Sequence, residues 1–311
     1  MADLRAQDNA GRVAIVTGAG KGLGRAFAEA LAASGLKVVV NNRRRPGEPS
    51  SADEVVEAIR AHGGEAVAEY SDVRDAGAPD ALVARALQTW GRLDAVILNA
   101  GVNGPAAKVE ALDPAALREV MEINFFANVA LLQAALPHLQ AAESGRLVFV
   151  ASSAGLYGVR GRAPYSASKG ALIALALTMA HELRRAEVGV NVLTPYAATQ
   201  MTPEALNSEV GEMLTPQAAA PMAVWLTSPR CRDTGQVWVA GGGWFRRAQV
   251  EENPGGGVAA GKVATTEWIE AHLDQLGDMS EARGYFGAEA AFADLAARVM
   301  GQAEPEPVAG G

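Results

Sequence analysis

The chain has 311 residues, which is enough for one large α/β domain or for two smaller ones. Hydrophobic residues make up 49% of the sequence, so the chain can bury a large core. The formal net charge of −8 disfavours a nucleic-acid partner.

Three features predict a cytoplasmic protein without a membrane segment. Residues 1–11 are polar and charged and lack the apolar core of a signal peptide. The longest apolar helical stretch, Gly170–Ala180, is too short to cross a bilayer. The single cysteine, Cys231, excludes an internal disulfide and fits a reducing compartment. No metal site is predicted.

The first recognisable unit is a strand, a glycine turn and a helix. The apolar run Arg12–Thr17 predicts a buried strand, and an alanine-rich helix ends near Ser34. Between them lies the turn Gly18–Gly24, which carries four glycines. This layout brings backbone N–H groups and a helix N-terminus against a pyrophosphate. Tight turns use the same glycines, but the flanking strand and helix favour a nucleotide site.

The second strand, Lys37–Asn42, ends where dinucleotide-binding folds commonly carry an acidic residue for the adenosine ribose. This chain has Asn42 there, followed by three arginines at 43–45. No carboxylate repels a 2′-phosphate, and several guanidiniums can pair with one. Lys21 in the glycine turn adds another cation. The arginines could form an ordinary solvated turn, but the pattern favours NADP(H) over NAD(H).

Strands and helices go on alternating along the chain. Further strands are predicted at Ala66–Tyr70, Leu93–Leu98, within the run Gly145–Ser153, at Gly189–Leu193 and at Gln236–Ala240. Further helices are predicted at Ser51–Ala61, Pro79–Trp90, Asp113–His138, Ala163–Arg185 and Pro216–Leu226. This alternation predicts an α/β fold: a doubly wound (Rossmann) parallel sheet of about seven strands, with helices on both faces and ligands at the carboxyl edge.

Tyr165 and Lys169 lie four residues apart, which places both side chains on one face of a helix. A neighbouring ammonium favours phenolate and lowers the pKa of a tyrosine toward neutral pH. Such a spacing also arises by chance in long helices. Ser152, at the end of a predicted buried strand thirteen residues earlier, supports the functional interpretation.

Asn124 lies in an otherwise apolar part of the predicted helix Asp113–His138. A buried carboxamide needs hydrogen-bond partners. Asn124 is therefore either a structural bridge or a site residue.

Together these features resemble the short-chain dehydrogenase/reductase family over about Gly11–Gly243. The matching motifs stand in the family's order and spacing: Thr17-Gly18-x-x-x-Gly22-x-Gly24, Asn99-Ala100-Gly101, Asn124, Ser152 and Tyr165-x-x-x-Lys169. The resemblance implies that Tyr165 is the general acid/base and that Ser152 hydrogen-bonds the substrate oxygen. It implies that Lys169 binds the nicotinamide ribose and lowers the tyrosine pKa, and that Asn124 holds a water linking the lysine to solvent.

The resemblance also implies a set of cofactor contacts. These are Thr17, Gly18, Gly20, Lys21, Gly22, Leu23, Gly24, Asn42, Arg43, Asp72, Val73, Asn99, Ala100, Gly101, Tyr165, Lys169, Pro195 and Thr199. Within this set, Asp72 would contact the adenine, Asn99 would stabilise the sheet beside the cofactor and Thr199 would meet the carboxamide. In the family, cations at the positions of Lys21 and Arg43 accompany NADP(H).

The chain departs from the family in two places. The family commonly has Pro-Gly after the sixth strand, but this chain has Pro195-Tyr196, and that tyrosine could project toward the nicotinamide or the substrate. The chain also extends beyond the expected domain, 1–243. We expect a helical extension at 244–301, packed on the domain or on a partner subunit, and a disordered tail at 302–311.

The resemblance implies interconversion of a secondary alcohol and a ketone on a bulky apolar small molecule, by a homodimer or homotetramer. The helical extension carries predicted helices at Thr266–Leu276 and Ala288–Met300. The chain plan and the motif Val-Trp-Val-Ala-Gly-Gly-Gly-Trp-Phe at 237–245, before this helical tail, more weakly resemble the (3R)-hydroxyacyl-CoA dehydrogenase domains of β-oxidation multifunctional enzymes. A 3-hydroxyacyl/3-oxoacyl thioester is therefore the leading substrate, and a hydroxysteroid or another alicyclic or aromatic ketone is the alternative. A protein that senses NADPH without catalysis is an alternative of another class.

Overall fold

The computed structural model describes residues 9–44, 47–198, 208–259 and 262–301. The chain forms two compact units, Met1–Ala248 and Gln249–Gly311, which are treated separately below. The predicted tail at 302–311, Arg45 and Thr199 lie outside the described residues.

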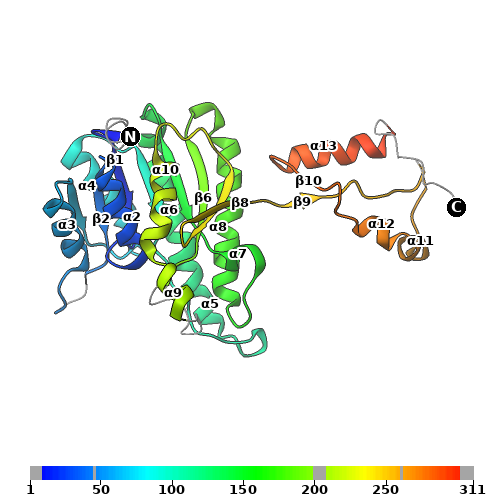
Figure 1. Ribbon diagram of the computed structural model, residues 1–311, viewed down its shortest axis with the longest axis horizontal. Helices are drawn as coiled ribbons and strands as arrows, with labels where there is room; N and C mark the ends of the chain where they lie inside the picture. Colours follow the sequence, from blue (N-terminus) through cyan, green and yellow to red (C-terminus); the bar gives the residue numbers. More distant parts are fainter. Residues whose placement is uncertain (1–8, 45–46, 199–207, 260–261, 302–311) are drawn as a thin grey trace. The chain divides into compact units, whose positions relative to one another are not determined.

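The first unit is built on an eight-stranded sheet with the order β3-β2-β1-β4-β5-β6-β7-β8 (Figure 1). The strands are β1 (Val13–Val16), β2 (Lys37–Asn41), β3 (Ala66–Glu69), β4 (Ala95–Leu98), β5 (Arg146–Val150), β6 (Gly189–Pro195), β7 (Gln236–Gly241) and β8 (Trp244–Ala248). The first seven pair in parallel and β8 pairs antiparallel with β7. Because β2 and β4 flank β1, the order reverses there, and a ligand crevice is expected at the carboxyl ends of β1 and β4.

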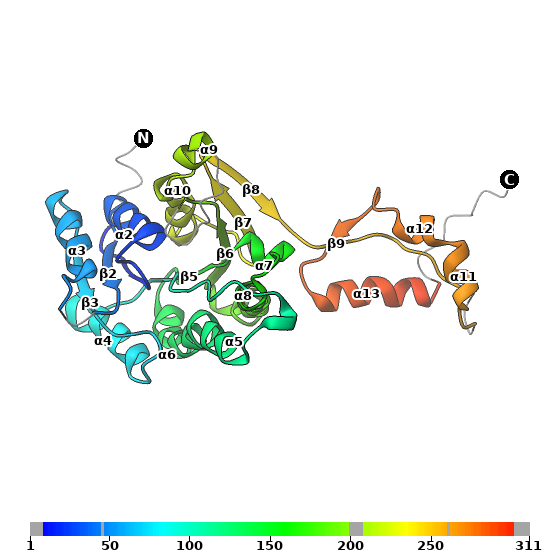
Figure 2. The ribbon, with the colours of Figure 1, turned by 90° about the horizontal axis from the view of Figure 1, so that it is seen from below.

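Helices cover both faces of this sheet (Figure 2). One face packs against α2 (Gly22–Ala33), α3 (Ser51–Ala61) and α10 (Pro216–Thr227). The other face packs against α4 (Ala78–Trp90), α6 (Ala127–Ala141) and α8 (Ala163–Glu182). Shorter elements are η1 (Val109–Ala111), α5 (Pro114–Met121), η2 (Glu122–Phe126), α7 (Ser153–Tyr157), η3 (Arg184–Ala186) and α9 (Ser208–Met213). The prediction of a doubly wound α/β sheet is confirmed.

Three details differ from the predictions. The eighth strand, β8, was not predicted, because its residues are charged or exposed and show no apolar alternation. The expected helix Asp113–His138 is interrupted by the π-helical turn η2, which periodicity does not reveal. The longest apolar helix is therefore not Gly170–Ala180 but the continuous segment Pro114–Ala141.

By length and composition alone, the segment Pro114–Ala141 could cross a membrane, and 44% of its most apolar window is buried. Its C-terminal half, α6, contributes Leu131, Leu132 and Leu139 to the core beneath the sheet. This packing is typical of the core helix of a globular domain.

The second unit contains three helices and a short ribbon. The strands β9 (Glu251–Glu252) and β10 (Arg283–Gly284) pair antiparallel. The helices are α11 (Thr266–Ala271), α12 (Leu273–Gly277) and α13 (Ala288–Val299). Among the described residues of this unit none is buried.

Candidate active site

The glycine turn is held so close to its neighbours that side chains do not fit. A Cβ on Gly20 would lie 2.3 Å from the Ser51 hydroxyl, and one on Gly24 would lie 2.4 Å from the carbonyl oxygen of Gly18. Ala19 N donates to Asn41 O at 2.7 Å, which ties the turn to the end of β2. The bare backbone of this turn and the start of α2 leave room for a phosphate-bearing ligand.

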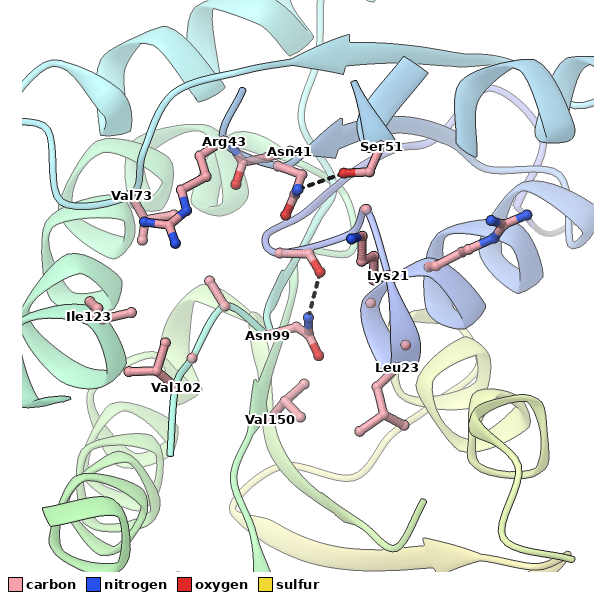
Figure 3. Close-up of a pocket in the computed structure, with 18 of the residues that line it drawn as sticks. Lys21, Leu23, Asn41, Arg43, Ser51, Val73, Asn99, Val102, Ile123 and Val150 are labelled. Atoms are coloured by element: carbon pink, nitrogen blue, oxygen red, sulfur yellow. Dashed lines mark hydrogen bonds between the residues drawn. The ribbon is translucent and has the colours of Figure 1, made fainter. Parts of the chain in front are cut away.

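Thr17 and Asn99 join the turn to the carboxyl end of β4. Thr17 Oγ1 accepts hydrogen bonds from the backbone N–H groups of Asn99 and Ala100, both at 3.0 Å. Asn99 Nδ2 donates back to Thr17 O at 2.9 Å. Figure 3 shows Asn99 at the centre of the pocket, with Lys21 and Leu23 on one side and Val102 and Ile123 on the other.

Asn42 occupies the position where dinucleotide-binding folds commonly carry an acidic residue for the adenosine ribose. Its Nδ2 donates to Ser51 Oγ at 2.7 Å. Beside it, Arg43 Nη1 pairs with Asp72 at 3.2 Å, and Arg74 forms a second ion pair with the same carboxylate. The bond to Arg74, before that to Arg43, holds the pKa of Asp72 well below its usual range.

Of the other cationic side chains in this region, Arg44 contacts an aromatic ring and Lys21 is exposed at the cavity. The Arg44 guanidinium lies 5.4 Å from the centre of the Tyr70 ring, so it faces an aromatic partner. Lys21 is exposed and lines the cavity. Lys21 and Arg43 are thus the predicted cations that reach the cavity within the described part of the chain.

A buried network beneath this region was not predicted as functional. Asn41 Nδ2 donates to Glu69 Oε2 at 2.7 Å and to Ser71 O at 3.1 Å. Glu69 Oε1 also accepts from the backbone N–H of Ser71 at 3.0 Å. Asn41 and Ser71 line the cavity, so the network fixes its floor where β2 and β3 end. The sequence signal was an Asn that closes an otherwise apolar strand.

The candidate catalytic groups meet at the end of β5. Ser152 is the N-cap of α7, and its Oγ accepts from Ala154 N at 3.2 Å. Tyr165 lies in the first turn of α8. Its burial raises the pKa of the phenol, which a hydrogen bond with Ser152 partly offsets. The two hydroxyl groups therefore lie near each other.

Lys169 is buried one turn later on α8. Its Nζ donates to Val150 O at 2.8 Å and lies 5.8 Å from the centre of the Tyr165 ring. Burial lowers the pKa of this lysine to about 8. Burial sets the direction of the Tyr165 pKa shift in this structure, and the expected lowering of that pKa by Lys169 stays a prediction.

Asn124 acts as a bridge in this structure. Its Oδ1 accepts from Val102 N at 2.8 Å and its Nδ2 donates to Val102 O at 2.9 Å. The same Nδ2 donates to Ser168 Oγ at 2.9 Å. The Asn124 carbonyl accepts from Asn128 Nδ2 at 2.7 Å. Asn124 therefore anchors the segment after β4 against α8, and its expected water-holding role stays a prediction.

A cavity of about 1250 Å³ joins these parts. It is lined by Gly18, Gly20, Lys21, Gly22, Leu23, Gly24, Asn42, Arg43, Asp72, Val73, Asn99, Ala100, Gly101, Tyr165, Lys169 and Pro195 from the predicted set. It also meets residues that were not predicted, including the acidic Glu48 and Glu54. Thr17, Asn124 and Ser152 do not line it. Thr17 and Asn124 instead hold lining segments in place, and Ser152 lies near the lining residue Tyr165.

The cavity fits a dinucleotide. Its volume exceeds that of pockets for drug-sized ligands. One end is bare glycine backbone at a helix N-terminus and the other end carries Tyr165 and Lys169. A Cβ on Gly101 would lie 3.3 Å from Lys169 Nζ, so this position too must stay open.

Comparison with known proteins agrees with this arrangement. The family model for short chain dehydrogenase matches residues 12–209. The peroxisomal multifunctional enzyme type 2 of Mus musculus is 35% identical over 280 residues, which cover 88% of this chain and 37% of that enzyme. The 3-oxoacyl-[acyl-carrier-protein] reductase of Synechocystis is 37% identical over 199 residues, 64% of this chain and 78% of that protein. A crystal structure of a short chain dehydrogenase from Mycobacterium avium superposes with a TM-score of 0.76 at 34% identity, covering 89% of this chain and 97% of that one.

Proposed function

The chain belongs to the short-chain dehydrogenase family, and on that premise we propose that it interconverts a secondary alcohol and a ketone with NADP(H) and with Tyr165 as proton donor and acceptor. Family membership makes it an oxidoreductase that uses a nicotinamide cofactor and acts on CH–OH groups of small molecules. The proximity of Ser152 to the half-buried Tyr165, one helical turn before the buried Lys169, carries the proposal.

In the ketone-reducing direction, the cofactor supplies a hydride to the carbonyl carbon when bound. Ser152 donates a hydrogen bond to the carbonyl oxygen, which strengthens as negative charge grows there. Tyr165 gives its phenolic proton to that oxygen, so the product is the alcohol. Lys169 holds the ribose end of the cofactor and supports the charge left on the phenol. The oxidation runs through the same groups in reverse.

For the substrate we propose a bulky apolar ketone, with a 3-hydroxyacyl/3-oxoacyl thioester as the leading candidate. Similarity to a 3-oxoacyl-[acyl-carrier-protein] reductase and to a peroxisomal multifunctional enzyme supports the thioester. A hydroxysteroid or another alicyclic or aromatic ketone is the second candidate. Tyr196, which follows β6, and Trp244, which begins β8, favour such a body.

The mechanism is tested by replacing Tyr165 with phenylalanine. Tyr165→Phe should lower kcat by ~10²-fold or more, because it removes the proton donor. NADPH affinity should change little. Tyr157→Phe is the matched control, because Tyr157 lies nearby on α7 and is exposed. Turnover of more than a tenth of the wild-type rate in Tyr165→Phe would contradict the assignment. Tight NADPH binding without turnover of any ketone or 3-oxoacyl thioester by the wild type would instead favour a sensor.

The NADP(H) preference is supported by the neutral Asn42 and by Lys21 and Arg43 at the cavity. The acidic lining residues Glu48 and Glu54 oppose it. We expect Asn42→Asp combined with Arg43→Leu to shift the preference toward NADH by at least ~2 kcal/mol, the scale of charge-assisted bonds to a phosphate.

Arg74→Leu serves as the control for this double variant. Arg74 also pairs with Asp72 but does not line the cavity. It should therefore leave the ratio of kcat/KM for the two cofactors unchanged. A wild-type enzyme that uses NADH better than NADPH would make the preference wrong.

We also propose an oligomeric state and a cellular location for the enzyme. Members of the family typically oligomerise, and we propose a homodimer or homotetramer. The buried free thiol of Cys231 supports a cytoplasmic location. Light scattering on the purified protein measures the assembly directly.

A further inference from the structure

Tyr196 follows the last residue of β6 and replaces the glycine that the family commonly has there. Tyr196 N donates to Ala240 O at 2.7 Å, so it continues the pairing with β7 for one more residue. Its neighbour across the strands is Gly241, where a Cβ would lie 2.7 Å from both the Cβ and the carbonyl oxygen of Tyr196. The tyrosine is therefore accommodated only because position 241 has no side chain.

Trp244 stands on the other side of the same glycine. Gly241 pairs with Trp244 in the antiparallel ladder of β7 and β8. Paired residues on neighbouring strands point to the same face of a sheet. Tyr196, Gly241 and Trp244 thus form one row across three strands, with two aromatic residues flanking bare backbone; we call this row the aromatic shelf.

Alternation along the strands shows which face carries the aromatic shelf. Val190 and Val192 of β6, which have the parity of Tyr196, belong to the core cluster beneath α8. Val237 of β7 and Ala248 of β8, which have the parity of Gly241 and Trp244, pack against the same cluster. The shelf therefore lies on the face that carries α8, the helix of Tyr165.

The shelf also lies at the carboxyl edge of the sheet, which is the edge that carries the cavity. It follows the carboxyl ends of β6 and β7, and β6 is the neighbour of β5, where Ser152 and Tyr165 meet. Pro195, the residue before Tyr196, lines the cavity together with Tyr165. Ala198, two residues after Tyr196, also lines the cavity, so the shelf adjoins the cavity wall.

The shelf is open. Trp244 is 83% exposed and Tyr196 is 37% exposed. An indole at this exposure leaves a large apolar area in water, which marks a surface that receives another apolar body. Glycine between two aromatic residues lets that body approach the backbone.

We propose that the aromatic shelf binds the apolar body of the ketone substrate, with Tyr196 and Trp244 as specificity-determining residues. This rests on the proposed function but adds the place and the chemistry of substrate recognition. The occupant is an apolar chain or ring system attached to the reacting carbonyl group, which lies flat over Gly241 between the two aromatic side chains.

The experiment compares three ketones with Trp244→Ala and Tyr196→Gly. The substrates are a small β-keto ester, a long-chain 3-oxoacyl N-acetylcysteamine thioester and a decalone. We expect either variant to lower kcat/KM at least ~10-fold for one bulky substrate, the scale for an apolar group in a pocket. The small ester should change less than ~2-fold, and NADPH affinity should not change. The substrate that loses more identifies a chain or a ring system.

Matched variants separate this effect from general damage. Trp225→Ala removes another exposed tryptophan, from α10 on the opposite face of the sheet, and should change no kinetic constant. Tyr196→Phe should keep wild-type kinetics. Gly241→Ala should resemble Tyr196→Gly, because the added methyl group displaces the tyrosine. The proposal would be overturned if kcat/KM fell equally for all three ketones, or if it fell for neither bulky ketone. A changed assembly with unchanged kinetics would also overturn it.

Binding separates the failure of this inference from that of the proposed chemistry. Calorimetric titration of Tyr165→Phe with the bulky ketone, in the presence of NADPH, reports affinity without turnover. Adding Trp244→Ala to Tyr165→Phe should weaken that affinity at least ~10-fold. Unchanged affinity would refute the shelf, whatever the role of Tyr165.

Discussion

Lys169 is a buried residue whose protonation the fold perturbs strongly. It is fully buried, hydrogen-bonds one carbonyl oxygen, and has a pKa lowered by burial to about 8. The usual value for a lysine is about 10.4. Between these values the unfolded chain binds the proton and the folded protein does not, so this group's contribution to stability rises as the pH increases from 8 to about 10. Below pH 8 burying the ammonium is a constant cost.

The same pKa predicts the pH dependence of ketone reduction. The ammonium form of Lys169 predominates below about pH 8. In the proposed mechanism this form favours charge on Tyr165 and binds the ribose hydroxyls. We therefore expect kcat/KM for the reduced cofactor, which reports the free enzyme, to be flat at neutral pH and to fall above about pH 8. Lys169→Met should lower the rate and abolish this limb. An alkaline limb that is unchanged in Lys169→Met would assign it to another group.

Glu187 is the non-glycine residue with positive φ, at 56°, in the described part of the chain. It lies in the turn between η3 and β6. A left-handed conformation costs a non-glycine residue roughly 1–2 kcal/mol. Glu187→Gly should therefore raise the free energy of unfolding by ~0.5–1 kcal/mol, after the larger backbone entropy of glycine is subtracted.

Urea denaturation measures this change, and Glu182→Gly is its control. Glu182 ends α8, where glycine is a poor helix former, so that variant should lose up to ~1 kcal/mol. A destabilised Glu187→Gly would show that contacts of the carboxylate outweigh the backbone strain.

Among single residues, the sequence predicted those whose neighbours are close to them in the chain. Tyr165 and Lys169 share a helix face, so four-residue spacing was sufficient. Asn124 was left open between bridge and site because its partners, Val102 and Ser168, come from other segments. Gly241 carried no signal for Tyr196, since the two positions become neighbours only when β6 pairs with β7.

Among the elements, α7 and α8 position the proposed catalytic groups by backbone contact. A Cβ on Gly155 of α7 would lie 2.6 Å from the carbonyl carbon of Lys169. Ser152 caps the start of α7, while Tyr165 and Lys169 lie on α8. The distance between these two helices therefore sets the distance between Ser152 and Tyr165.

Gly155→Ala should push α7 away from α8. Because backbone atoms cannot give way, we expect a loss of ~1–3 kcal/mol in stability from overpacking. We also expect kcat to fall more than the affinity for NADPH, because Ser152 moves relative to Tyr165. Gly170→Ala is the matched control: its Cβ would lie 3.4 Å from Gly155 O, an ordinary contact. Equal effects of both variants on kcat would contradict this positioning role.

The elements that could be predicted are those whose own residues show a recognisable pattern of apolar side chains. The seven parallel strands are short apolar runs because both faces are buried. In contrast, β8 has no buried residue, so nothing in its sequence marked it as a strand. The π-turn η2 contains Asn124, whose side chain bonds to Val102 and Ser168 from other segments. Because these partners are distant in the sequence, the local helical pattern does not reveal the turn.

For the whole molecule, the distribution of buried residues is the informative feature. Both core clusters lie entirely before residue 249. The second unit has no buried residue in its described part, although α13 carries exposed Phe292, Leu295 and Val299 at helical spacing. An apolar stripe without a core of its own requires a cover from another surface, and short isolated helices are marginal in water.

We propose that the second unit shapes the substrate site or a subunit interface and takes no part in the chemistry. The catalytic groups and the described residues that line the cavity all lie in the first unit. Truncation after Ala248 should therefore leave NADPH affinity nearly unchanged and a small ketone still reduced.

The same truncation should raise KM for a bulky ketone, or change the assembly measured by light scattering, because it removes the apolar stripe of α13. Phe292→Ser combined with Leu295→Ser is a finer variant that keeps the chain length and should act in the same direction. Ala291→Ser combined with Ala296→Ser, at half-buried positions of the same helix, is its control and should have a smaller effect. A truncated protein with unchanged kinetics on every substrate and an unchanged assembly would show that the second unit has neither role. Loss of NADPH binding in a folded truncation would instead place the unit at the cofactor.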